Sequence, residues 1–153
     1  MPQLVKGGKH VFAWSRIGLD GKVRVPPEAF EEYRLQDDPS AILTSASKTS
    51  GGFALVREDV FRQAPLGTFL NAHPELAGSL EQGAILRGKQ RLYARVALRA
   101  GEFTLSPEQA AGFGVRPGDL LLVVRGSGLG PSFLAKGPII QEARAHPKLE
   151  VFD

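Results

Sequence analysis

Apolar residues occur along this chain in short stretches separated by turns, which predicts a mainly β protein with short helices. The longest uninterrupted apolar run is Leu120–Val124, and eighteen glycines and eleven prolines supply turns between stretches. A helix is expected at Pro107–Phe113, because Ser106 can cap its start, proline fits its first position and Gly114 can end it.

The strip from Arg91 to Arg99 alternates between apolar and polar residues. Successive side chains of a β-strand point to opposite faces, so the apolar ones face a core while Arg91, Tyr93, Arg95 and Arg99 face outward. Arginine suits a polyanion because its planar fork bonds phosphate or guanine in a bidentate way. The alternative interpretation is a solvated outer face of an edge strand, where basic residues discourage aggregation.

The sequence contains an internal repeat with an offset of 80 residues. Residues 8–53 align without a gap with residues 88–133, and seven positions are identical, Gly21/Gly101 and Phe53/Phe133 among them. The apolar positions of the two copies match as well. This organisation predicts a first unit at 1–57, a helical connector at 58–82, a second unit at 83–138 and a tail at 139–153.

Each copy is expected to contain two strands joined by a tight turn, a short helix, a third strand, a loop and a fourth strand. In the first copy these elements are predicted at 16–19, 22–25, 27–33, 41–45 and 53–56. In the second copy they are predicted at 95–99, 102–105, 107–113, 120–125 and 133–136. The connector is expected to be helical at 57–63 and 68–80, and the tail to contain a short helix before Pro147.

The charge is distributed unevenly. The net charge is +3, but residues 1–26 carry five cations and one acid, and residues 83–100 carry five cations and no acid. Residues 27–82 carry four cations and nine acids. Segregation of this kind is expected when one surface is basic and the others are not, as in proteins that bind nucleic acid.

Other classes of site find little support. The chain has no cysteine, which excludes disulfides and thiolate metal sites, and its three histidines have no metal-ligand spacing. The segment from Gly83 to Lys89 has phosphate-loop spacing, but Gln90 stands where that loop needs Ser or Thr. No catalytic arrangement is recognisable, so neither an enzyme, a cofactor nor a metal is expected. Without a signal-peptide or membrane-spanning run, a cytoplasmic location is expected.

Two segments resemble the AbrB/MazE/SpoVT/MraZ superfamily of swapped-hairpin β-barrel transcription regulators. Gly21-Lys22-Val23-Arg24-Val25-Pro26 is similar to the first half of the family pattern, and Gly114-Val115-Arg116-Pro117-Gly118-Asp119-Leu120-Leu121-Leu122 to the second half. The resemblance covers roughly residues 8–136. It implies a swapped-hairpin (double-psi-like) β-barrel in which two copies interdigitate, here formed within one chain as an intrachain pseudo-dimer.

The sequence departs from the family pattern in both copies. The first copy has Gln36-Asp37-Asp38-Pro39 at the position of the family's Gly-Asp turn. The second copy has Glu102 where the family carries a basic residue.

The resemblance implies a transcription regulator that binds double-stranded DNA through basic residues of the first two strands. Carried over by position, it nominates Arg16, Lys22 and Arg24 in the first copy and Arg95 and Arg99 in the second. Strand alternation and the two basic segments add three further candidates: Lys9, Lys89 and Arg91. Nucleoid association is expected if the protein binds DNA. The alternative is a degenerate barrel that serves as a protein-interaction or assembly module, which Glu102 favours; homo-oligomers and protein partners stay open.

Overall fold

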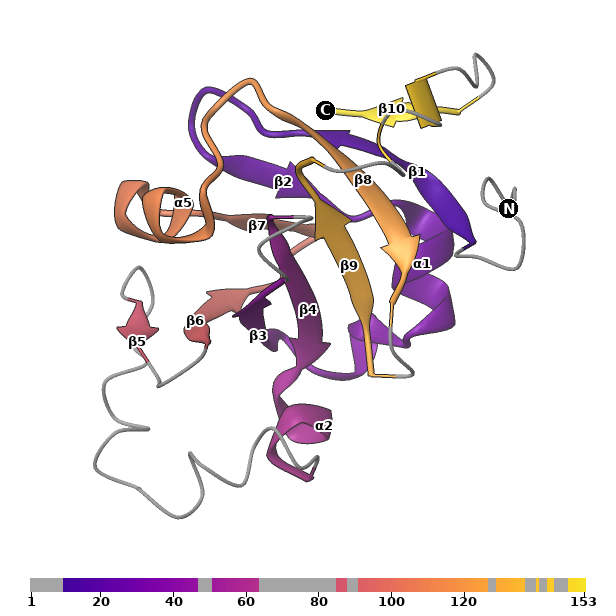
Figure 1. The fold of residues 1–153 in the computed structure, drawn as a ribbon. Helices are drawn as coiled ribbons and strands as arrows, with labels where there is room; N and C mark the ends of the chain where they lie inside the picture. The colour runs from indigo at the N-terminus through magenta and orange to yellow at the C-terminus, as the bar shows by residue number, and fades with distance from the viewer. Residues whose placement is uncertain are drawn as a thin grey trace.

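The computed structural model describes residues 10–46, 51–63, 85–87, 91–126, 129–136, 140, 143–144 and 149–153. These residues form a mainly β structure with short helices (Figure 1). Its elements are β1 (Val11–Arg16), β2 (Lys22–Arg24), α1 (Pro27–Glu32), the 3-10 helix η1 (Leu35–Asp37), β3 (Ser40–Ser45), β4 (Phe53–Arg57), α2 (Glu58–Gln63), β5 (Leu86–Arg87), β6 (Leu92–Ala97), β7 (Glu102–Thr104), α5 (Pro107–Phe113), β8 (Leu120–Arg125), β9 (Pro131–Leu134) and β10 (Val151–Phe152).

The strands form one large sheet and one separate two-stranded ribbon. The eight-stranded sheet has the order β10-β1-β8-β9-β4-β3-β6-β5, and β2 pairs with β7 in the ribbon. Only the β1–β10 pair is parallel among the described strand pairs. The sheet is open, with β10 and β5 as its edges, so the closed barrel expected from the sequence is not confirmed.

The two sequence copies are interleaved in this sheet. The first strand of each copy pairs with the third strand of the other, β1 with β8 and β6 with β3. At the centre of the sheet Phe53 pairs with Phe133, and in the ribbon Val23 pairs with Phe103. Both are pairs of equivalent residues 80 positions apart, as an approximate two-fold relation between the copies requires.

The ungapped alignment is wrong for the first strands, because the two hairpin turns differ in length. In the second copy Ala100 and Gly101, with φ of 53° and 77°, form a two-residue turn between Arg99 and Glu102. The first copy places three residues between Gly18 and Lys22. As a result β1 and β6 are 81 residues apart, and both begin earlier in the chain than predicted.

The glycine of the longer turn, Gly21, is required there for two reasons. Its φ of +86° is unfavourable for other residues, and an added Cβ would lie 2.3 Å from the backbone oxygen of Leu105. The turn of the first copy thus lies directly against the chain that leads into α5.

The main core lies between the sheet and the ribbon. Its centre is a group of fully or almost fully buried phenylalanines: the rings of Phe53 and Phe133 stack at 5.1 Å, and each lies 5.9 Å from Phe103. The opposite face of the sheet is also covered, by Ile140 and Ala143 of the tail over β1 and β8 and by α2 over β3 and β6. Burial on both faces explains why β8 is apolar without alternation.

The second copy follows the sequence prediction closely in α5 and β8. Ser106 accepts a hydrogen bond from the backbone of Gln109 in a complete capping box, and Gly114 ends the helix at a φ of 73°. β9 begins two residues before its predicted start at 133. β10, paired with β1, was not predicted, and the helix expected at 68–80 lies outside the described residues.

Candidate nucleic-acid interface

The β2–β7 ribbon has one buried face and one exposed face. Val23 and Phe103 point into the core, with 0% and 2% of their surface exposed. The strand register places Lys22 opposite Thr104 and Arg24 opposite Glu102. Because side chains alternate along a strand, these four share the outer face. We call this outer face the ribbon face.

The carboxylate of Glu102 engages both cations of the ribbon face. One oxygen lies 3.6 Å from Lys22 Nζ and the other 4.0 Å from Arg24 Nε. The lysine and arginine side chains are 52% and 48% exposed, whereas Glu102 is 29% exposed. Exposed ion pairs at these distances contribute little to stability. Both cations therefore stay available to a stronger anion.

Two further exposed arginines lie near the hairpins, and Arg99 lies opposite Glu102 of the ribbon. Arg99 is exposed beside the second hairpin turn, and it makes no ion pair with any described residue. Arg16 at the end of β1 is exposed and donates to the backbone oxygen of Gly118 at 3.2 Å. Lys22, Arg24 and Arg99 give three cations against the two carboxylates Asp20 and Glu102, a formal charge of +1.

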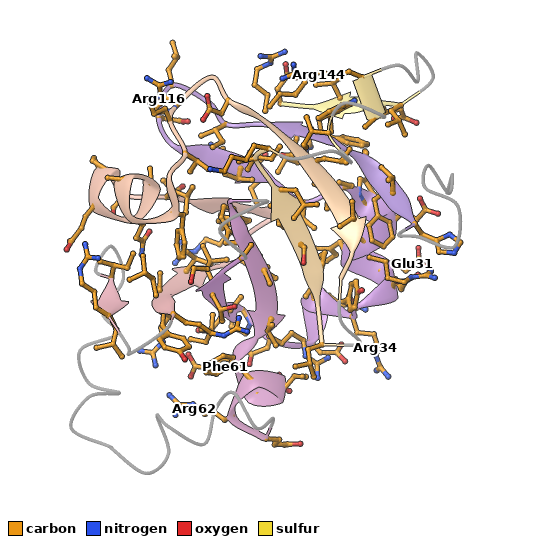
Figure 2. All side chains as sticks on the ribbon, in the orientation of Figure 1. Glu31, Arg34, Phe61, Arg62, Arg116 and Arg144 are labelled. Atoms are coloured by element: carbon orange, nitrogen blue, oxygen red, sulfur yellow. The ribbon has the colours of Figure 1, made fainter. Side chains whose placement is uncertain are left out.

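The outer face of β6 is covered, which corrects the expectation that it is an open basic strip. Its apolar side faces the core as predicted, but Tyr93 on the other side is only 8% exposed and packs against Phe61 of α2 at 6.0 Å. Arg95 Nε donates to Glu58 Oε1 at 2.6 Å. Figure 2 shows Phe61 and Arg62 on α2, the helix that supplies these contacts.

The remaining predicted residues do not join the ribbon face. Arg91 is exposed on the β6 side of the sheet and donates to the backbone oxygen of Ser45 at 3.4 Å. Lys9 and Lys89 lie outside the described residues. The structure thus brings Lys22 and Arg24 together, with Arg99 beside the adjoining turn. Arg16 lies at the end of β1, and Arg91 and Arg95 lie on the β6 side of the sheet.

Glu58 of α2 has three partners: Ser40 and Arg95 on the sheet, and Arg62 within the same helix. Oε1 accepts hydrogen bonds from Arg95 and from the Ser40 hydroxyl at 2.9 Å, and Oε2 accepts from Arg62 at 3.3 Å. Burial alone would raise the pKa of Glu58, but the Ser40 hydrogen bond and the Arg95 charge outweigh it and lower the pKa. The charged carboxylate is therefore the form that stabilises this contact.

We expect Glu58→Gln to destabilise the protein by about 1–2 kcal/mol at pH 7, because the amide keeps the shape but not the charge-assisted bonds. The pKa of Glu58 is lower in the folded protein than in the unfolded chain, where it is about 4.5. Its contribution to the free energy of unfolding is therefore present above pH 4.5 and is lost as the pH falls through the folded-state pKa. Urea denaturation of both proteins at pH 7 and at pH 3 measures the difference. Equal stabilities at pH 7, or a gap that does not narrow in acid, would contradict this role.

Sequence reasoning missed the role of Glu102 at the ribbon face. The alignment showed that it replaces a basic residue, but a sequence comparison does not show which side chains meet across strands. The usable signal was the two-fold relation itself: if residues 23 and 103 pair at an axis, residue 102 must lie opposite residue 24.

Other kinds of site find no support in the described part of the chain. No group of three or more His, Asp or Glu side chains there is placed to hold a metal ion. None of its helices is long and apolar enough to span a membrane. In comparisons with known proteins, no family model matches the chain, and no curated protein or solved structure matches it either.

Proposed function

We propose that this protein is a DNA-binding transcriptional regulator of the AbrB/SpoVT type, which contacts duplex DNA through the ribbon face and the adjoining Arg16 and Arg99. One observation carries the proposal: the ribbon buries Val23 and Phe103 while Lys22 and Arg24 stand exposed on its other side. An exposed basic face on a two-stranded ribbon is a suitable surface for a polyanion.

The shape of the ribbon fits a known mode of recognition. The major groove of B-DNA admits a two-stranded β-ribbon, and lysine and arginine bond either guanine or phosphate there. Thr104 on the same face also suits base edges, since threonine bonds several bases. Arg16 and Arg99 would then contact flanking phosphates, which set register and orientation.

The strand pairing supports the swapped-hairpin part of the proposal. β1 and β2 form a hairpin whose first strand pairs with β8 and whose second pairs with β7, both from the second copy. The second hairpin does the same with β3 and β2. In this proposal the ribbon covers the open side of the main core, and one chain supplies both halves of the pseudo-dimer.

Glu102→Gln tests the proposal through a gain of binding. Removal of the carboxylate frees Lys22 and Arg24 from their shared partner, so we expect duplex affinity to rise about fivefold at low salt. The slope of log K against log salt should steepen by about 0.9 if one more phosphate is neutralised. Fluorescence anisotropy with a labelled mixed-sequence duplex pool measures both quantities.

Glu31→Gln is the matched control, because Glu31 is an exposed glutamate on α1, off the ribbon face (Figure 2). The same charge change there should alter affinity far less. Equal gains from both variants would indicate a general charge effect rather than contact at the ribbon face. No duplex binding by any of the three proteins would favour the protein-interaction alternative, which the neutralising position of Glu102 supports.

A further inference from the structure

The tip of the first hairpin exposes a large apolar side chain. Leu19 is 91% exposed, and among the described residues the only other exposed large hydrophobic side chain is Val151, at 45%. Leu19 is absent from the apolar clusters of the described residues. Full exposure of a leucine at the end of a turn therefore adds no packing to the fold.

A hollow of about 260 Å³ lies beside this leucine. It lies between the first hairpin turn and α5, and its lining is predominantly apolar: Leu19 forms part of its edge, with Ile17, Leu105, Ala110, Val115 and Pro117. An apolar cavity of about 150 Å³ is large enough for benzene, so this hollow has room for a leucine side chain. The same patch thus carries a protruding leucine and a recess that could receive one.

We propose that the protein self-associates through this patch, with Leu19 of each copy inserted into the hollow of the other. In a two-fold contact the same surface meets itself, so every feature must be complementary to another feature of the same patch. The protruding leucine and the apolar hollow satisfy this requirement. A second copy of the chain is therefore the occupant that the patch fits.

The charges at the hollow fit the same arrangement. Asp20 and Arg116 both line it. One oxygen of Asp20 accepts from the backbone of Lys22 at 3.0 Å, and the Arg116 side chain is exposed and makes no ion pair with a described residue. Figure 2 shows Arg116 at the outside of the molecule, beside the loop between β1 and β2. A two-fold contact would bring Asp20 of each copy to Arg116 of the other.

A contact confined to this hairpin tip and hollow would be small, so the dimer should be weak. Interfaces that bury less than about 1,200 Å² in total are typical of transient association. Self-association should thus depend on protein concentration and weaken with salt, because the ion pairs lie at the rim. It does not depend on the proposed DNA binding and is measured without DNA.

Sedimentation velocity over a concentration series tests the proposal. The wild-type mass should rise from one chain towards two, and Leu19→Asp should weaken self-association at least about tenfold. Val151→Asp is the matched control, since it adds the same charge at the other exposed apolar side chain, and it should behave as wild type. Both positions are exposed, so each variant should fold as the wild type does, and circular dichroism checks this.

Reversal of the charges at Asp20 and Arg116 distinguishes a direct ion pair from a structural effect of either substitution. Asp20→Lys and Arg116→Glu should each weaken the dimer, and the double variant should restore it, because the exchanged charges again face each other. A wild-type protein that stays monomeric throughout the series would overturn the proposal. The proposal would also be overturned if Leu19→Asp self-associates as strongly as the wild type. Species larger than a dimer would overturn it too, because a two-fold contact closes at two copies.

Discussion

Replacement of Lys22 and Arg24 by alanine should lower duplex affinity by at least about 100-fold at low salt. Each cation is expected to make a charge-assisted contact worth about 1.5 kcal/mol or more, and 1.4 kcal/mol corresponds to a factor of ten. Both side chains are exposed and outside the core, so the variant should fold. Anisotropy with the mixed-sequence duplex pool gives the affinities, and its salt slope should fall by about 1.8 if two phosphate contacts are lost.

The matched control removes the same two charges from other elements. Arg62 lies on α2 and Arg144 in the tail, both away from the ribbon face (Figure 2). Alanine at these two positions should change duplex affinity only slightly and leave the salt slope nearly unaltered. If the two double variants lose affinity equally, the net charge of the chain, not the ribbon face, determines binding.

Phe53→Ala should destabilise the protein by about 3–5 kcal/mol, the usual range for removal of a buried aromatic ring. Phe53 is fully buried and contacts the rings of Phe103, Phe113 and Phe133. Because the approximate two-fold relation pairs Phe53 with Phe133, the same substitution at Phe133 should have a similar effect. Urea denaturation measures both free energies of unfolding.

Glu31→Ala is the control for the core substitutions, since an exposed side chain on α1 should change stability by less than about 0.5 kcal/mol. If Phe53→Ala does not fold, Phe53→Leu keeps most of the volume and should still cost about 1 kcal/mol. A loss below about 1 kcal/mol for Phe53→Ala would show that the two copies do not share a core at this position.

Local chemistry made the helix α5 of the second copy predictable. Ser106, the proline after it and Gly114 specify both ends of α5 through capping and backbone preference. The repeat could be recognised because equivalent core positions keep their apolar character, and Phe53 and Phe133 are in fact strand partners. Interleaving of the copies followed from the family resemblance, not from the residue pattern of either copy.

Contacts between distant segments were not predictable in the same way. Alternation placed Arg95 and Tyr93 on one face of β6, but it does not show that α2 covers that face with Glu58 and Phe61. A basic face that is open in the sequence pattern can be neutralised by a helix from elsewhere in the chain. The two hairpin turns differ in length by one residue. This difference was not predicted, because an ungapped alignment cannot represent it.

The most direct test of the ribbon face as a DNA interface is chemical-shift mapping by NMR with the duplex pool added to ¹⁵N-labelled protein. The account predicts that the largest amide shift changes fall at residues 22–24 and 102–104, with smaller ones at Arg16 and Arg99. The chemical shifts of the amides of α2 and β6 should stay almost unchanged. Shift changes concentrated at α2 and β6, with residues 22–24 and 102–104 unaffected, would contradict the central claim.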